Sequence, residues 1–249
     1  MDKNDPLRQL WLAFVLLTRL PLPHLPENAF SQGPRAVWAY PLVGFVVGAI
    51  GALTGQISLS LGLPVTGSAV LALGAMILLT GAMHEDGLAD MFDGFWGGTT
   101  TARRLDIMRD SQIGTYGVLA LILVCLAKIS ALSVLLGSGG WAIVAAAALS
   151  RGIMPALMHG LPHARVDGLS RSVGVPPRRA AVTAAAIGAL AALLCLGSLG
   201  IAAICVAALV GLATALLAKR KIGGQTGDVL GAAQQLGETA ILLICAAAL

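Results

Sequence analysis

Two long runs without a charged side chain constrain the fold of this 249-residue chain more than any other feature. Residues 36–83 and 180–218 contain no Asp, Glu, Lys or Arg, and each run can supply two helices of roughly 20 residues across a bilayer. In lipid every backbone polar group needs an internal partner, so only helical bundles and closed barrels can span. The runs are continuous and rich in Ala, Leu and Gly, so we predict an all-α, polytopic membrane bundle that forms one domain over residues 1–249.

The hydrophobic segments predict six or seven transmembrane helices. A final segment begins polar and ends apolar, and we expect Asp228, Gln234, Gln235 and Glu238 on it to face the bundle interior. About a dozen apolar residues between Arg8 and Arg19 are too few to span, so the N-terminal segment 1–35 is expected to carry an interfacial helix. The predicted spans are 38–60, 67–83, 116–136, 141–160, 181–198 and 200–218, followed by the segment 228–249.

The basic residues predict the orientation of the bundle. Nearly all Lys and Arg lie in segments 1–35, 84–110, 163–179 and 219–238, which fall on one side of a six-span count. Since Lys and Arg favour cytoplasmic loops, this side is expected to face the cytoplasm. Lys128 and Arg151 fall inside predicted spans, where each needs a partner or a cavity.

Segment 84–114 holds six of the twelve acidic residues and predicts a metal site. Asp86, Asp90 and Asp93 stand at i, i+4 and i+7, within about a 60° arc of one helix face. Three such carboxylates repel one another unless a hard cation such as Mg²⁺ binds them. Asp106 and Asp110, at i and i+4, offer a second pair on a following helix, so one or two divalent ions are expected. The alternative is a solvated acidic loop, although the acids keep helical register beside apolar neighbours.

Basic residues interleaved with these acids predict phosphate binding. Arg103, Arg104 and Arg109 lie between or beside the two acidic groups. One guanidinium group can donate two parallel hydrogen bonds to the oxygens of a phosphate. The connector "GFWGGTTTA" has backbone amides free to face a phosphate, but it lacks the Gly-Lys-Ser/Thr signature of a Walker A loop. We therefore expect Arg103 and Arg104 to contact a phosphorylated substrate.

The motif "HEDGLADMFDG", followed by "RRLDIMRDSQIGTYG", resembles the signature of the cobalamin synthase family, the adenosylcobinamide-GDP ribazoletransferases. The likeness extends to "LLTRLPLP", "YPLVGFVVGAIGAL" and "GGQTGDVLGAAQQLGE". It implies a Mg²⁺-dependent transfer in which the 3′-hydroxyl of α-ribazole, or of its 5′-phosphate, attacks the cobinamide-side phosphorus of adenosylcobinamide-GDP. GMP leaves, and adenosylcobalamin or its 5′-phosphate is formed. The resemblance also implies a bacterial cytoplasmic (inner) membrane enzyme with its active site on the cytoplasmic side.

A looser likeness links the same motif to the CDP-alcohol phosphotransferases. Asp90, Asp93 and Gly94 match the start of their motif, and Asp106 with Asp110 match its end, but the intervening Ala-Arg is missing and the spacing is shorter. This analogy implies Asp90, Asp93 and Asp106 as first metal ligands and Asp86 as a fourth. Asp110 would accept the acceptor's proton or complete the metal shell, and Arg109 would hold a phosphate. Asp228 and Glu238 are further candidates for substrate contact.

Two rival functions remain open at this stage. One is a membrane phosphotransferase that acts on a CDP-alcohol. The other is an ion-coupled transporter, which is disfavoured because the acids flank the spans while transporter sites lie near the midplane. The expected partners are the two substrates and the lipid bilayer, with no nucleic acid, and a homodimer is the default oligomer.

Overall fold

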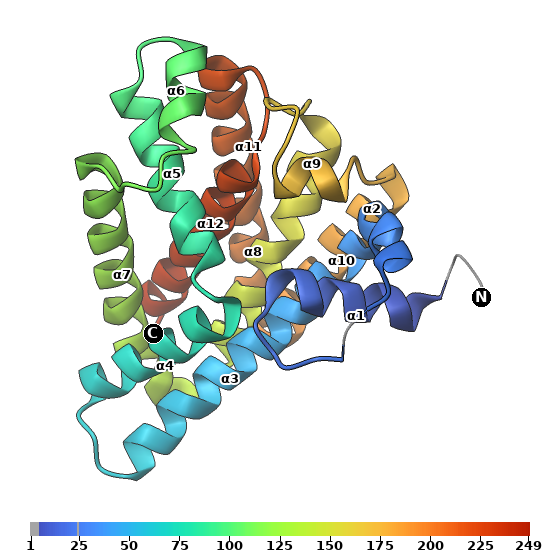
Figure 1. Cartoon of the computed structure of the whole chain (residues 1–249). Helices are drawn as coiled ribbons and strands as arrows, with labels where there is room; N and C mark the ends of the chain where they lie inside the picture. The colour runs from blue at the N-terminus through green and yellow to red at the C-terminus, as the bar shows by residue number, and fades with distance from the viewer. Residues whose placement is uncertain (1–4, 24) are drawn as a thin grey trace.

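The computed structural model describes residues 5–23 and 25–249, which form the predicted all-α bundle (Figure 1). Extended structure in the described residues is limited to one isolated bridge between His163 and Gln225. Three short 3₁₀ helices cover Glu27–Gln32, Val37–Ala39 and Leu136–Ser138. The α-helices are α1 (Pro6–Leu17), α2 (Gly33–Ala36), α3 (Tyr40–Ser60), α4 (Val65–Thr80), α5 (Met83–Gly97), α6 (Thr101–Ile107), α7 (Thr115–Leu135), α8 (Trp141–Gly160), α9 (Leu169–Val173), α10 (Arg178–Leu196), α11 (Leu199–Ile222) and α12 (Gly227–Ala247).

The predicted spans agree closely with the long helices, which confirms a polytopic membrane protein. The final polar-to-apolar segment is a full helix, α12, and its length and composition suffice to cross a membrane. The predicted N-terminal helix also exists as α1, while its position in the membrane interface stays a prediction. In the described part of the chain six stretches can span: Ala29–Ser60, Thr115–Ser138, Trp141–Gly160, Arg178–Leu196, Leu199–Ile222 and Gly227–Ala247.

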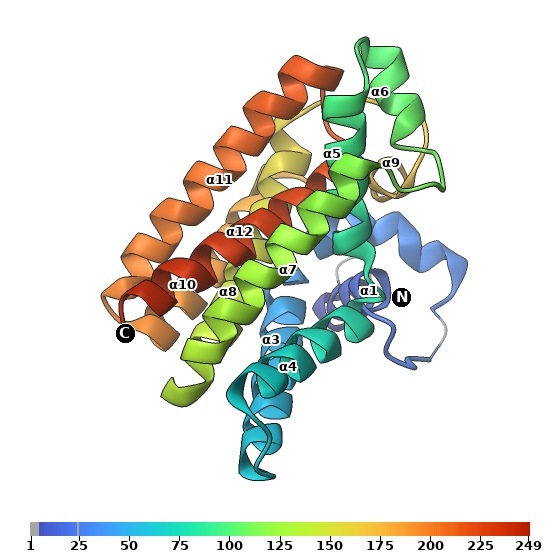
Figure 2. The ribbon, with the colours of Figure 1, turned by 90° about the vertical axis from the view of Figure 1, so that its left-hand side faces the viewer.

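The span predicted over residues 67–83 takes a different form, because α4 ends at Thr80 after 16 residues. Gly81 and Ala82 both adopt left-handed backbone angles, with φ of 66° and 58°. This conformation ends a helix and redirects the chain, and it costs a residue with a Cβ about 1–2 kcal/mol. The following helix, α5, leaves α4 at 89° and packs alongside α7 and α12 (Figures 1 and 2). The bend therefore carries the acidic segment back against the bundle.

The central helix of the bundle is α8, which packs against α3, α10 and α12. Of its 20 residues, 16 are buried. Small side chains allow this close packing, since a Cβ at Gly44 of α3 would overlap the backbone carbonyl of Ala147. Arg151 of α8 faces α12, where its guanidinium lies 3.3 Å from the Glu238 carboxylate.

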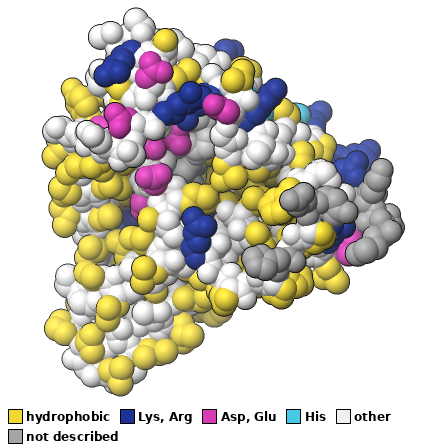
Figure 3. Space-filling model, viewed as in Figure 1, with side chains coloured by type: hydrophobic (Ala, Val, Ile, Leu, Met, Phe, Trp, Pro, Cys, Tyr) yellow, Lys and Arg dark blue, Asp and Glu magenta, His cyan; other side chains and the backbone are white. Residues whose placement is uncertain are grey.

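Charged side chains gather at one end of the molecule. In Figure 3 they lie mostly over the upper part of the face, where Figure 1 has α5, α6 and α9. The lower part, over the α3–α4 hairpin, is hydrophobic or uncharged. This distribution agrees with the predicted separation of charged and uncharged loops.

Candidate functional site

The acidic face of α5 meets the first turns of α12 where two glycines let the backbones touch. A Cβ at Gly87 would lie 3.0 Å from the Cα of Asp228, and one at Gly231 would lie 3.2 Å from the Cα of His84. Any larger residue at either position would push the two helices apart. Because the helices cross here, Asp86 and Asp90 of α5 lie beside Asp228 of α12.

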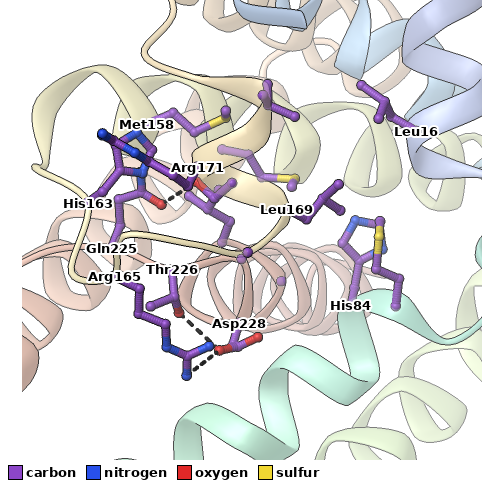
Figure 4. A pocket seen from close by; sticks show the side chains of 18 of the residues that line it. Leu16, His84, Met158, His163, Arg165, Leu169, Arg171, Gln225, Thr226 and Asp228 are labelled. Carbon is purple, nitrogen blue, oxygen red and sulfur yellow. Dashed lines mark hydrogen bonds and ion pairs between the residues drawn. The ribbon is translucent and has the colours of Figure 1, made fainter. Parts of the chain in front are cut away.

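Asp228 is free to face this crossing because another residue caps α12. The Thr226 hydroxyl accepts a hydrogen bond from the backbone N–H of Val229 at 3.4 Å and donates one to Asp228 Oδ2 at 3.1 Å. Thr226 is therefore the N-cap of α12, and the Asp228 carboxylate does not serve as the cap. The Arg165 guanidinium lies 3.3 Å from the same Asp228 oxygen, as Figure 4 shows.

Arg165 reaches the site because its loop is fixed to the turn before α12. The backbone N–H of Ala164 donates to the Gln225 carbonyl at 2.9 Å, and the Gln225 N–H donates to the Pro162 carbonyl at 2.8 Å. The approach is so close that a Cβ at Gly224 would overlap the Pro162 carbonyl. The loop after α8 and the start of α12 therefore present one cation and one carboxylate together.

The resulting group is rich in carboxylates, and Arg165 is the cation that lies against it. Asp90 is half-buried, and the charges of Asp228, Asp86 and Asp93 repel its carboxylate while Arg165 attracts it. Among the described residues no three His, Cys, Asp or Glu side chains lie in an arrangement that could hold a metal ion. The donors still suit Mg²⁺, which is commonly held by one or two carboxylates and completed by water and substrate phosphates.

Asp93, predicted as a ligand, supports the start of α7 in this structure. Its carboxylate oxygens accept hydrogen bonds from the backbone N–H groups of Gly114 at 2.7 Å and Gly117 at 2.9 Å. Both glycines leave the room that the carboxylate occupies. Asp93 is 7% exposed, and no side chain of α7 itself caps that helix. Asp93 therefore has an architectural role that the acidic pattern did not reveal, and its role as a ligand stays a prediction.

Replacing Asp93 with Ala should therefore destabilise the protein. A buried amide at Gly117 and a partly buried one at Gly114 would lose their acceptor, and the loss of a helix cap costs about 1–2 kcal/mol. Thermal unfolding in detergent, measured without added metal, should show a clearly lower Tm for Asp93→Ala. Asp106→Ala, an exposed site on α6, serves as the control and should melt like the wild type. Equal melting of all three proteins would contradict the capping role.

The second acidic pair differs from its prediction. The helix expected to carry both Asp106 and Asp110 ends at Ile107, so Asp110 lies in the following turn and accepts from the backbone N–H of Gln112. Both aspartates are exposed, and neither is among the charges that act on Asp90.

Two of the three arginines predicted to bind phosphate contact other parts of the protein. Arg103 is exposed on α6, and Arg104 donates to the Lys221 carbonyl at 3.0 Å. Arg109 forms an exposed ion pair with Asp167. Their contacts with substrate stay predictions.

Glu238 lies in the bundle interior, within a buried polar network. Lys128 lies 2.7 Å from one carboxylate oxygen and Arg151 lies 3.3 Å from the other, and all three side chains are 2% exposed. Gln234 also donates to Glu238, while Gln235 accepts from Lys128 and donates to Glu85. Glu238 is therefore the partner that the buried Lys128 and Arg151 were expected to need. It joins α5, α7, α8 and α12.

A cavity of about 210 Å³ opens beside the crossing of α5 and α12 (Figure 4). Asp86, Arg165 and Asp228 belong to its polar wall. His84, Arg165, Gln225 and Thr226 also line the cavity, although none of them was among the predicted site residues. Two sequence features could have indicated three of these residues. The "GGQTG" turn before Asp228 contains Gln225 and Thr226, and the arginine-rich loop 163–179 contains Arg165.

Comparison with known proteins places the whole chain among relatives. A family model described as cobalamin-5-phosphate synthase matches residues 9–246. A protein of Bradyrhizobium diazoefficiens named adenosylcobinamide-GDP ribazoletransferase is 46% identical, over 98% of this chain and 95% of its own. Proteins with the same name from Mesorhizobium japonicum and Brucella ovis are 45% and 40% identical, over 96% and 98% of this chain and 92% and 98% of their own. No solved structure matches the chain.

Proposed function

The chain belongs to the cobalamin-5-phosphate synthase family, and we infer that it is an adenosylcobinamide-GDP ribazoletransferase of cobalamin biosynthesis. The observation that carries this conclusion is near full-length similarity to relatives that bear this name. The all-α membrane bundle and its carboxylate-rich crossing agree with such an enzyme.

We propose that Asp86, Asp90, Asp228 and Arg165 form the reaction centre. The Arg165 guanidinium, now held by Asp228, has the donors to grip an oxygen of the donor's diphosphate. A carboxylate at the crossing is positioned to accept the proton of the acceptor's 3′-hydroxyl, which then attacks the cobinamide-side phosphorus as GMP leaves. Asp86, which lines the cavity, is the proposed proton acceptor.

Magnesium is the proposed cofactor, and when bound it would neutralise the charge of the diphosphate and of the leaving GMP. Asp90 is the central candidate ligand, because the charges of three neighbouring carboxylates, Asp228, Asp86 and Asp93, make the potential around it more negative. The earlier predictions of Asp93 and Asp106 as ligands, of Asp110 and Arg109 as catalytic residues and of Arg103 and Arg104 as substrate contacts remain alternatives to be tested beside it.

We further propose that the reaction centre faces the cytoplasm. Lys219, Arg220 and Lys221 end α11 at the same end of the bundle as α6, since Lys221 contacts both Arg104 and the Phe95 carbonyl. Such clusters favour the cytoplasmic side of a membrane. A homodimer remains the default expectation for oligomeric state.

The proposed function predicts release of GMP. The full-length protein, purified into lipid nanodiscs, should release GMP from adenosylcobinamide-GDP when α-ribazole and Mg²⁺ are present. Omission of α-ribazole or addition of a chelator should each reduce the release to background. The rival phosphotransferase predicts CMP release from CDP-diacylglycerol and an alcohol instead. Absence of GMP in an assay that detects turnover by a related transferase would contradict the proposed function.

A further inference from the structure

The cavity beside the reaction centre combines an apolar interior with a polar wall. It lies between the loop after α8, the first turns of α5 and α12, and the ends of α1 and α8 (Figure 4). Asp86, Arg165 and Asp228 stand at one part of its lining. Much of the remaining lining is hydrophobic and includes Leu16, Met83, Met154 and Met158. Ser170, Arg171 and Gln225 add polar groups on the side of the loop after α8. The cavity therefore suits a ligand with an apolar body and an attached polar group that reaches Asp86, Arg165 and Asp228.

His84 is buried in the cavity lining without a hydrogen-bond partner. The side chain is 1% exposed, and within the described residues neither ring nitrogen has an acceptor or a donor. A neutral imidazole carries one N–H donor and one acceptor, and leaving them unpaired in a buried site is unfavourable. In Figure 4 His84 lies to the right of Asp228, on the side of the cavity where Leu16 and Leu169 lie. A ligand that reaches past the carboxylates would meet this imidazole.

A second histidine adds a donor to the same lining. Burial, and then the charge of Arg171, lower the pKa of His163, which favours a neutral ring. Gln225 accepts from the Ser170 hydroxyl at 2.7 Å, so its amide nitrogen donates to His163 Nδ1 at 3.0 Å. The proton of the neutral ring is then on Nε2, which has no acceptor among the described residues.

The size and polarity of the cavity indicate which part of the two substrates can bind in it. Pockets for drug-sized ligands measure about 300–1,000 Å³, so a cavity of about 210 Å³ suits one bicyclic ring system and excludes a corrin ring. Guanine would bring several donors and acceptors into a largely apolar space. The base of ribazole is a dimethylbenzimidazole, an apolar bicycle with a single ring nitrogen free to accept a hydrogen bond.

We propose that this cavity binds the benzimidazole base of the acceptor nucleoside, with the His84 N–H donating to the free ring nitrogen of the base. The ribose hydroxyls then lie toward Asp86 and Arg165, where the phosphoryl transfer is proposed to occur. The methionines and Leu16 surround the methyl-substituted edge of the base. This assignment rests on the proposed function and adds to it the location of the acceptor.

The test measures the KM of each substrate separately for the full-length enzyme in nanodiscs. His84→Leu should raise the KM for α-ribazole about tenfold, because one hydrogen bond to the base is lost, and should leave the KM for adenosylcobinamide-GDP within about twofold. The control His159→Leu changes an exposed histidine of α8 outside the cavity lining, and both KM values should stay unchanged. An equal rise in both KM values for His84→Leu, or no rise, would overturn the proposal.

An acceptor analogue separates hydrogen bonding from general damage to the fold. The α-riboside of dimethylindole lacks the accepting ring nitrogen, so the wild type should use it about tenfold less well and His84→Leu should cause no further loss. If His84→Leu fails to fold, Leu169→Trp provides the second variant, because Leu169 lines the cavity and is 50% exposed. It should raise the KM for α-ribazole alone, and an unchanged KM would contradict the proposal. Inactivity of the wild type would instead refute the proposed function.

Discussion

Replacing Asp90 with Asn is expected to lower kcat at least about 100-fold while the protein remains in the membrane. The amide keeps the shape of the carboxylate but removes the charge that the proposed magnesium and diphosphate chemistry requires. The same change should leave Tm equal or slightly higher, because the repulsion that Asp228 and Asp86 exert on Asp90 disappears. Loss of activity together with retained stability is typical of a functional carboxylate cluster.

Rates of GMP release and thermal unfolding curves, measured on the same preparations, check this expectation. Asp5→Asn is a suitable control, because Asp5 caps α1 through its side chain and Asn caps equally well. Asp106→Asn tests the competing ligand prediction on α6. If Asp90→Asn keeps more than about a tenth of the wild-type rate, the central role of Asp90 is wrong.

Glu238→Gln is expected to have the largest effect on stability. Lys128 and Arg151 both pair with this carboxylate at 2% exposure, so the substitution leaves two buried cations without their carboxylate partner. Removal of one partner from a buried ion pair costs about 3–5 kcal/mol. The variant should therefore accumulate poorly in membranes and unfold at a markedly lower temperature than the wild type.

A second substitution shows whether charge is the cause. Lys128→Met removes one of the two cations, so the double variant Lys128→Met/Glu238→Gln restores the charge balance of the network and should recover much of the lost Tm. The double-mutant cycle then reports the coupling between Lys128 and Glu238. A double variant less stable than Glu238→Gln alone would show that shape or hydrogen bonding, and not charge, holds the network together.

Loss of the network should also disturb the geometry of the reaction centre. Gln235 links Lys128 to Glu85, the residue directly before Asp86 on α5. The buried charges thus fix α5 against α12 at the level of the carboxylates, which connects the stability of the bundle to the geometry of the proposed site.

The membrane bundle, the ends of most helices, the acidic face of α5 and the family could all be predicted from the amino-acid sequence. These features follow from local patterns: uncharged runs of span length, a helical period in Asp86, Asp90 and Asp93, and continuous motifs such as "HEDGLADMFDG". Hydrophobicity and period are properties of neighbouring residues, so they can be read without knowing which helices meet.

Which side chains share a site depends on how the helices pack, and this could not be predicted from the sequence. Helix packing places Glu238 against Lys128 and Arg151. It also places Asp93 against the amides of α7 and Arg165 against Asp228. A buried charge demands a partner, but its own segment does not say which residue far along the chain will supply it. The left-handed Gly81 and Ala82 and the close approach at Gly87 set those meetings, because they depend on space left by other helices.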